Sequence, residues 1–529
     1  MTVVILGIAL VILLSILAEK FSDKFGMPAL ILFMFIGMLF GSDGIFKIPF
    51  DNFELANNIC SIALVFIMFY GGFNTKWSVA KPVAVKAVLL STVGVLMTAG
   101  ITTIICHFLF GLSLPESFLI GSVLSCTDAA SVFAILRKYK LNLKDGTASI
   151  LEVESGSNDP VSYMLTMIAI SMMGSKESTN ILGLIVLQLT FGVLIGIMVS
   201  RISLFIMTKT KLISEGLDTI FMIAMVLVCY GVTSIVNGNA YLSLYLFGIM
   251  IGNSRIRNKQ MLIPFFDGVT SLAQILIFFL IGLLSFPHQM SQIVPLALAI
   301  VVTLTVVARP IAVFVLMSPF KCSMKQNLVI SWAGLRGASS CVFAIMAVAA
   351  GISMKQDLFH IVFMVSLFSV TIQGMLLPYV SKYFDMVDND ADVRKTFNDY
   401  QEDTALQLIT IHIPEYHGWA NRMIKDITMP TGALALMIKR GDETIITKGD
   451  TLVHVGDNVI LSVPPYIPSE DEQLEERYIS KKDKWCNKKI SELALGRDEL
   501  IAMIIRGDET IIPDGKTVIC EKDVVVLYK

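Results

Sequence analysis

The chain has 529 residues, of which 55% are hydrophobic and only 16% are charged, a balance that excludes an ordinary soluble protein. Residues 1–380 hold 22 Lys and Arg against 16 Asp and Glu, whereas residues 381–529 hold 19 against 27. We therefore predict a slightly basic polytopic membrane domain followed by an acidic tail. No nucleic-acid partner is expected.

The chain begins with an apolar segment, MTVVILGIALVILLSILAEK. This segment has no basic n-region and no small-residue cleavage site, so it predicts a first membrane span and not a signal peptide. A helix needs about 20 mostly apolar residues to cross a bilayer, and thirteen candidate spans can be placed on that basis. They lie near residues 2–18, 27–43, 58–72, 83–110, 115–136, 149–173, 180–207, 218–236, 239–252, 268–286, 290–317, 327–350 and 357–380. The runs at 58–72 and 239–252 are short and need their neighbours to extend them.

The loops between these spans carry basic residues in an alternating pattern. One alternate set of loops holds fifteen Lys and Arg, and the other set holds only Lys47, Lys176 and Lys355. Basic loops stay on the cytoplasmic side of a membrane. The pattern predicts an outer N-terminus and a cytoplasmic tail in the bacterial cytoplasmic (inner) membrane.

The span at 149–173 contains acidic residues within LEVESGSNDPVS, residues 151–162. A charged side chain at the bilayer centre costs about 2.5–3.5 kcal/mol on insertion scales, so such acids are rarely incidental. For Glu154 and Asp159 we predict an ion or proton pathway; the alternative is a structural ion pair or a helix end at the interface. For Glu152, which is expected nearer the cytoplasmic end, the structural role is favoured.

Spacing divides this segment into helix faces. Glu154 and Asn158 are four residues apart, as are Ser155 and Asp159, so each pair lies on one face of the helix.

Two other predicted spans are interrupted by polar residues. GSVLSCTDAASVFAIL (121–136) places Thr127 and Asp128 in mid-span, and SWAGLRGASSCVF (331–343) places Arg336 between two glycines. Such breaks in separate helices indicate discontinuous helices at the midplane of a transporter. Asp128 would compensate a half-helix dipole there, or alternatively cap a helix at the interface. Arg309, in another span, is a candidate structural partner.

The motifs TDAASV, ESGSNDP and GLRGA, in this order, resemble the NhaP-type branch of the cation:proton antiporters. The resemblance covers roughly residues 1–380. It implies an all-α domain of about thirteen membrane helices with inverted repeats and discontinuous helices. It also implies a homodimer, in which a fixed dimerisation region supports a mobile core bundle that carries the ion.

The resemblance further implies roles for the motif residues. Asp159 would alternately bind a proton and a monovalent cation, with Glu154, Ser155 and Thr127 helping to coordinate it. Arg336 would pair with Glu154. In supporting roles, Asn158 would orient its neighbours and Asp128 would compensate a helix dipole. One departure is Ala129, where many relatives carry Pro, and it bears on the local backbone break and not on the ion site.

The residues themselves are consistent with this mechanism. If Glu154 and Arg336 neutralise each other, Asp159 is left as the one free buried acid. Burial disfavours its charged form, so it would be neutralised by one proton or by one cation. Exchange of K⁺, or alternatively Na⁺, for H⁺ at one site is then predicted to be electroneutral.

The tail contains a repeat with a constant offset of 66 residues. MIKRGDETIITKGDTLVHVGDNVILSV (437–463) aligns with MIIRGDETIIPDGKTVICEKDVVVLYK (503–529). A strict period indicates two copies of one small unit. We predict a linker at 381–403, a first domain at 404–463, a second linker at 464–478 and a second domain at 479–529.

Each copy is predicted to contain a short helix, at WANRMIKDI and WCNKKISEL, and then strands joined at RGDETII by a Gly-Asp turn. The copies resemble the TrkA-C domain, the C-terminal half of regulators on potassium channels and transporters. That resemblance implies a cytoplasmic α+β regulatory tail that can bind a small ligand, with cyclic di-AMP as one candidate. Arg440 and Arg506 could meet phosphates or be solvated turn residues. A purely structural dimerising module is the alternative.

No cofactor is predicted, since the tail contains no G-x-G-x-x-G for a dinucleotide. A tail-gated cation channel is disfavoured because no T-V-G-Y-G filter occurs. A membrane-embedded enzyme is disfavoured too, because no nucleophile–base pair or metal-ligand spacing stands out. The eight Cys are scattered and are predicted to be buried hydrophobes and not disulfides.

Overall fold

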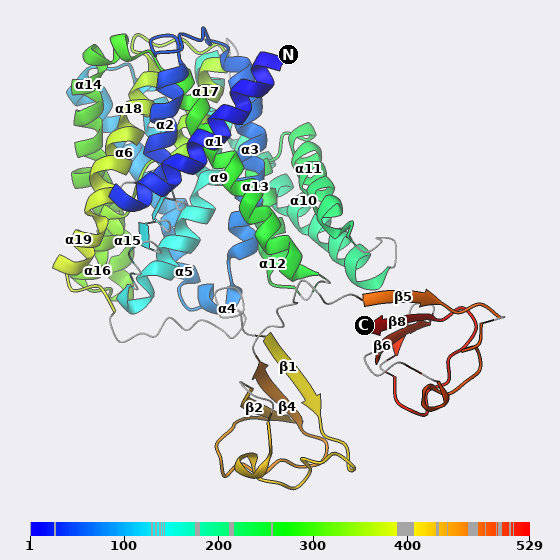
Figure 1. The fold of residues 1–529 in the computed structure, drawn as a ribbon. Coiled ribbons are helices and arrows are strands. Elements are labelled where there is room, and N and C mark those ends of the chain that lie inside the picture. The colour runs from blue at the N-terminus through cyan, green and yellow to red at the C-terminus, as the bar shows by residue number, and fades with distance from the viewer. Residues whose placement is uncertain are drawn as a thin grey trace. The chain divides into compact units, whose positions relative to one another are not determined.

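The computed structural model describes residues 2–25, 28–128, 131–132, 135–136, 139, 141, 143–174, 180–210, 216–254, 256, 258–388, 407–429, 433–441, 443–463, 474–481, 483–493, 495, 500–506, 509–511 and 513–528. The chain forms two compact units, Met1–Ala391 and Asp392–Lys529. The first is helical and the second is built from two small sheets (Figure 1). Ala129 lies outside the described residues.

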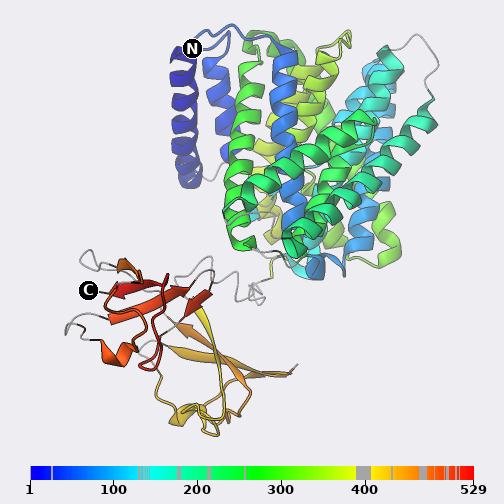
Figure 2. The same cartoon turned by 90° about the vertical axis from the view of Figure 1, so that its right-hand side faces the viewer.

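The helices of the first unit run largely alongside one another (Figure 2). They are α1 (Thr2–Phe25), α2 (Ala29–Phe40), α3 (Phe53–Asn74), α4 (Trp77–Ala80), α5 (Ala84–Leu89), α6 (Val95–Phe110), α7 (Leu114–Val123), α9 (Thr147–Gly174), α10 (Ile181–Lys209), α11 (Asp218–Ile235), α12 (Ala240–Gly252), α13 (Lys259–Leu283), α14 (Pro287–Val302), α15 (Arg309–Met317), α16 (Met324–Trp332), α17 (Ala338–Ala349), α18 (Leu358–Phe368) and α19 (Met375–Tyr383). Among the described residues, eight continuous helical segments are long and apolar enough to span a membrane. Four shorter apolar helices accompany them. The count of thirteen spans stays a prediction.

Three long helices contain a π-helical segment, in which the backbone bonds reach one residue further than in an α-helix. The segments are η1 (Leu90–Gly94) between α5 and α6, η3 (Thr303–Ala308) between α14 and α15, and η5 (Ser369–Gly374) between α18 and α19. Two short 3₁₀ turns also occur: η2 (Lys144–Gly146) directly precedes α9, and η4 (Ser318–Phe320) directly follows α15. π-Helical turns often occur at functional sites.

Both predicted polar interruptions are breaks in helical structure. α7 ends at Val123, and residues 124–128 continue without helical structure. α16 ends at Trp332, and α17 begins only at Ala338. In contrast, α9 runs unbroken through its acidic segment and through Pro160.

Small residues bring the remaining helices close together. A Cβ on Gly282 of α13 would lie 2.1 Å from the Met34 carbonyl oxygen of α2, and one on Gly248 of α12 would lie 2.2 Å from the Phe69 carbonyl oxygen of α3. Such close backbone approach is typical of helix packing in membranes, where van der Waals contact replaces the hydrophobic effect. These pairs join α2 to α13 and α3 to α12.

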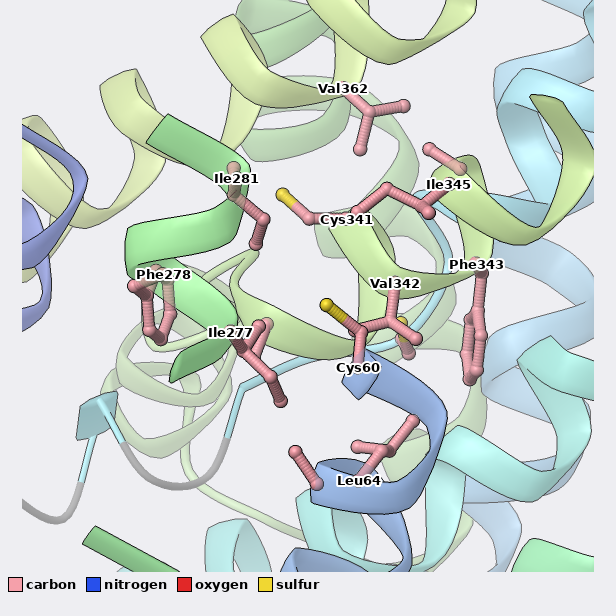
Figure 3. Packing of buried hydrophobic residues seen from close by; sticks show 14 of the residues in the cluster. Cys60, Leu64, Ile277, Phe278, Ile281, Cys341, Val342, Phe343, Ile345 and Val362 are labelled. Carbon is pink, nitrogen blue, oxygen red and sulfur yellow. The ribbon is translucent and has the colours of Figure 1, made fainter. Parts of the chain in front are cut away.

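An apolar cluster lies where α3, α13, α17 and α18 meet (Figure 3). Cys60 of α3 and Cys341 of α17 are buried in it together with Phe278 of α13 and Val362 of α18. All eight cysteines are free thiols, and five of them are buried. The prediction of buried cysteines thus holds for these five, whereas Cys322, Cys486 and Cys520 are only partly buried.

The second unit consists of two antiparallel four-stranded sheets with the same topology. The first sheet has the order β1-β4-β2-β3, and the second has the order β5-β8-β6-β7. Their strands are β1 (Gln407–His412), β2 (Leu434–Arg440), β3 (Glu443–Ile446), β4 (Asn458–Val463), β5 (Leu474–Tyr478), β6 (Leu500–Arg506), β7 (Glu509–Ile511) and β8 (Val524–Tyr528). The irregularity between Ala435 and Met437 recurs between Ile501 and Met503, 66 residues later. The predicted internal repeat thus has a structural counterpart.

The predicted short helices in the two copies are wrong. The segments that contain Asn421 and Asn487 form turns followed by single 3₁₀ turns, η6 (Ile424–Asp426) and η7 (Ile490–Glu492). Both asparagines have left-handed backbones, with φ of 59° and 62°. A left-handed residue ends a right-handed helix, and Asn adopts that conformation more readily than most residues.

The structure also moves two predicted limits. The membrane unit continues past residue 380, where Val387 forms a β-bridge with Leu143. β5 lies inside the segment predicted as the second linker and pairs with β8. The predicted Gly-Asp turn joins β2 to β3 at Gly441, which has φ of 58°, whereas Asp442 and residues 507–508 lie outside the described part of the chain.

Candidate functional site

The two discontinuous helices cross at their breaks. The Arg336 Nη1 donates to the carbonyl oxygens of Ser125, at 2.9 Å, and Cys126, at 2.5 Å. In the opposite direction, the backbone N–H of Asp128 donates to the Leu335 carbonyl oxygen at 2.8 Å. Each broken segment thus satisfies backbone groups of the other.

The charges at the crossing oppose the helix dipoles. Arg336 binds carbonyls just beyond the C-terminal end of α7, which carries partial negative charge. Asp128 lies beside Gly337, the residue before α17, since a Cβ there would lie 2.0 Å from the Asp128 Oδ2. That is the positive end of α17. The same carboxylate oxygen accepts a 2.5 Å bond from the Ser131 hydroxyl.

A chain of buried polar groups joins this crossing to α9. The hydroxyls of Thr127 and Ser155 are 2.8 Å apart, and Asn158 Nδ2 donates to Thr127 Oγ1 at 2.6 Å. All three side chains are buried, and Asn158 Oδ1 has no hydrogen-bond partner among the described residues. Polar atoms of Thr127, Ser155 and Asn158, from two segments, thus meet in the protein interior.

Asp159 lies next to this chain and is 3% exposed. Its Oδ2 accepts a 2.6 Å hydrogen bond from the Ser339 hydroxyl of α17, whereas its Oδ1 is buried without a hydrogen-bond partner in the described part of the chain. Leaving a charged oxygen buried and unpartnered is costly. The carboxyl group is therefore expected to acquire a proton or a cation.

Ser339 was not among the predicted site residues. Its only sequence signal is a hydroxyl placed three residues after Arg336, in the first turn of the helix that follows the break. The motif GLRGA ends one residue earlier, at Ala338.

The predicted pairing of Glu154 with Arg336 is wrong. Glu154 Oε1 lies 2.5 Å from Arg309 Nη2, and both side chains are almost fully buried. Arg309 follows the π-helical segment η3 and passes Gly334, where a Cβ would lie 3.0 Å from its Nε. The absence of a side chain at Gly334 leaves room for the guanidinium of Arg309, while Arg336 is held by the carbonyls after α7.

Two neighbouring residues of α9 complete the description. Glu152 is half-buried, unlike the fully buried Glu154. The Pro160 carbonyl oxygen, one residue after Asp159, accepts a 2.7 Å bond from Asn239 Nδ2 at the start of α12. In the described residues, no group of three or more His, Cys, Asp and Glu side chains is placed to hold a metal ion.

In the tail, the two arginines singled out by the repeat bind carboxylates. Arg440 donates to both oxygens of Asp457, at 2.9 and 2.8 Å, and Arg506 makes the equivalent bonds to Asp523, at 2.8 and 2.8 Å. The bonds from Arg440 lower the pKa of Asp457 despite its burial. Arg440 thus links the end of β2 to the residue before β4, and Arg506 links the end of β6 to the residue before β8, so neither is a free turn residue.

Known proteins resemble the chain over most of its length. The family described as "Sodium/hydrogen exchanger, transmembrane" matches residues 8–382. A K(+)/H(+) antiporter NhaP from Alkalimonas amylolytica is 31% identical over 466 residues, which cover 87% of this chain and 81% of that protein. A K(+)/H(+) antiporter NhaP2 from Shewanella sp. (strain ANA-3) is 29% identical over 456 residues, covering 85% and 79%.

Two further similarities involve Methanocaldococcus jannaschii. Its Na(+)/H(+) antiporter 1 is 26% identical over 364 residues, 66% of this chain and 84% of that protein. The solved structure of the sodium proton antiporter MjNhaP1 from the same organism, at pH 8, superposes with a TM-score of 0.63 and 20% identity. It covers 70% of this chain and 99% of that one.

Proposed function

The chain belongs to the transmembrane sodium/hydrogen exchanger family and is a multi-pass cation/proton antiporter. On this basis we propose that it exchanges K⁺ for H⁺ at Asp159. The proposed site comprises Asp159, Ser155 and Thr127, with Glu154, Asn158, Asp128 and Arg336 in support. One monovalent cation and one proton would occupy it in turn, which makes the exchange electroneutral.

The observation that carries this proposal is the state of Asp159. Its carboxyl group is buried in an unbroken helix, and one oxygen has no hydrogen-bond partner among the described residues. Glu154 already has Arg309 as its counter-charge. A proton or an alkali cation would neutralise Asp159, and the hydroxyls of Ser155 and Thr127 are the hard oxygen ligands that such a cation prefers.

The preference for K⁺ follows from how far the relatives align. The aligned stretch of 466 residues shared with the K(+)/H(+) antiporter NhaP is longer than the membrane unit, Met1–Ala391, and so includes part of the tail. The stretch shared with the Na(+)/H(+) antiporter 1 is only 364 residues. Na⁺ or Li⁺ exchange is the alternative, and a tail-gated cation channel is a weaker one.

The test is proton flux in everted membrane vesicles that contain the full-length protein. K⁺, Na⁺ and Li⁺ are added in turn to vesicles with an established pH gradient. We expect K⁺ to dissipate the gradient at the lowest concentration, without a change in membrane potential. A response to Na⁺ and Li⁺ alone would replace the K⁺ assignment, and a flux of cations without protons would support the channel.

Asp159→Asn is the decisive variant. It keeps the size and the polarity of the side chain but cannot exchange a proton for a cation at neutral pH. We expect no cation-dependent proton flux, with the protein still inserted and folded. Glu152→Gln, in the half-buried position two turns earlier, is the matched control and should retain exchange. Substantial exchange by Asp159→Asn would place the site elsewhere.

A further inference from the structure

Ser339 lies outside the resembling motifs and contacts Asp159, the proposed exchanging carboxyl group, directly. Its hydroxyl donates to Asp159 Oδ2 at 2.6 Å. Ser339 is half-buried in the first turn of α17, while Asp159 belongs to α9. The bond therefore joins the helix that follows a break to the unbroken helix that carries the acid.

The neighbouring serine shows that this contact is specific to one position. The Ser340 hydroxyl lies 3.3 Å from the Cys126 sulfur and, among the described residues, makes no hydrogen bond with Asp159. Successive residues of a helix point about 100° apart, so only one of two adjacent serines can face Asp159. Ser339 is the one that does.

A hydroxyl oxygen can both donate a hydrogen bond and bind a cation, which an alkyl group cannot do and an amide does only with two different atoms. It donates one hydrogen bond and keeps lone pairs that accept hydrogen bonds or bind a cation. Next to an ionised carboxylate it donates, as the structure has it. Next to a bound alkali ion, the same oxygen can turn its lone pairs toward the ion.

The surroundings of Asp159 leave a place for such a ligand. Asp159 Oδ1 and Asn158 Oδ1 are both buried without hydrogen-bond partners in the described part of the chain. The hydroxyls of Thr127 and Ser155 already bond to each other. An ion drawn to Asp159 Oδ1 needs further oxygens to replace its water, and the Ser339 hydroxyl, already bonded to Oδ2 of the same carboxylate, supplies one from α17.

We propose that Ser339 is a further ligand and positioning residue of the cation site, which supplies an oxygen from α17 and orients the Asp159 carboxylate. This inference rests on the proposed function of Asp159. It means that α17 contributes a side chain that binds the cation, whereas Arg336, before α17, only compensates the charge at a helix end. Removal of the hydroxyl should weaken cation binding more than it slows turnover.

The experiment compares Ser339→Ala, Ser339→Thr and Ser340→Ala in purified full-length protein reconstituted into liposomes. Initial rates of proton efflux are measured against K⁺ and, separately, Na⁺ concentration. For Ser339→Ala we expect the KM for the transported cation to rise about 10- to 150-fold, the loss that corresponds to one hydrogen bond with a charged group. The maximal rate should change much less, because the hydroxyl is proposed to act in binding the cation.

Ser339→Thr keeps the hydroxyl and should restore the KM, and Ser340→Ala should leave the KM unchanged. An unaltered KM in Ser339→Ala would overturn the inference. So would a loss of maximal rate and of thermal stability in all three variants, because that pattern means packing and not binding. Asp159→Asn is measured in parallel. Exchange by that variant refutes the proposed function itself. If Asp159→Asn shows no exchange but Ser339→Ala has an unaltered KM, only the role of Ser339 is refuted.

Discussion

At the scale of single residues, the arginines show what a sequence can and cannot establish. Both Arg309 and Arg336 are visible as rare charges in apolar segments, and so is Glu154. Which arginine meets the acid depends on the π-helical segment before Arg309 and on the space beside Gly334, and neither follows from spacing along the chain. Spacing placed Glu154 with Asn158, and Ser155 with Asp159, on faces of one helix, and the resemblance to the antiporter motifs implied that they form one site. Ser339 was missed because its partner lies 180 residues away.

The ion pair gives the first prediction at this scale. Arg309→Gln strands the buried Glu154 carboxylate, which should lower the free energy of unfolding by about 3–5 kcal/mol. Glu154→Gln together with Arg309→Gln should cost less than the sum of the two single changes. Thermal unfolding of the purified protein in detergent measures both.

A second double-mutant cycle, between Glu154 and Arg336, is the matched control. Arg336 binds the carbonyls of Ser125 and Cys126, so its loss should couple to Glu154→Gln less strongly than the loss of Arg309 does. Strong coupling to Arg336 and none to Arg309 would restore the pairing that the sequence suggested.

At the scale of elements, the helix breaks were predictable and the tail helices were not. Glycines around a lone charge in an apolar segment have few explanations other than a break, and α16 and α17 are separated there. In the tail, WANRMIKDI has the apolar spacing of a helix, but Asn421 adopts a left-handed backbone within it. That conformation is set by contacts with the segment at 449–453, whose carbonyls accept bonds from Asn421, Ile424 and Lys425. Tertiary hydrogen bonds thus override the local pattern.

Asn239, the residue that starts α12, provides a prediction at this scale. Its Oδ1 accepts from the Leu242 N–H at 3.1 Å, and its Nδ2 donates to the Pro160 carbonyl of α9 at 2.7 Å. Asn239→Ala loses the cap, about 1 kcal/mol, and in addition the buried bond to α9, about another 1 kcal/mol. The midpoint of thermal unfolding in detergent should fall accordingly.

Asn52→Ala is the matched control, because the Asn52 Oδ1 accepts from the Leu55 N–H at 2.8 Å in an exposed turn at the start of α3 and, in the described part of the chain, forms no hydrogen bond with α9. This variant should lose only the stability that the helix cap contributes, about 1 kcal/mol. If the two variants lose equal stability, the bond to Pro160 contributes nothing to holding α12 against the helix that carries Asp159.

At the scale of the whole molecule, the two compact units of the structure, Met1–Ala391 and Asp392–Lys529, meet some ten residues beyond the limit of 380 that the sequence predicts for the membrane domain. Composition changes near residue 380, yet a β-bridge between Val387 and Leu143 keeps the following residues with the helices. A β-bridge involves two residues and leaves almost no trace in composition. The offset of 66 residues, in contrast, was visible because each copy must bury its own apolar face, and Ile438 and Ile504 are both fully buried.

The division of the chain supports a last prediction, that the tail regulates exchange and takes no part in carrying the ion. The residues of the proposed ion site all lie within Met1–Ala391, and the tail is a separate unit with its own apolar clusters. A ligand bound to the tail can act only through different affinities for the states of the membrane unit. A chain that ends near residue 395 should therefore still exchange cations for protons, with an altered dependence on pH or cation concentration.

Cyclic di-AMP, the first ligand to try, should change the flux of the full-length protein in liposomes and leave the truncated protein unaffected. Truncated protein that carries Asp159→Asn sets the background rate. If the truncated protein is folded, by its thermal unfolding, yet exchanges no faster than that background, the tail is part of the transport machinery.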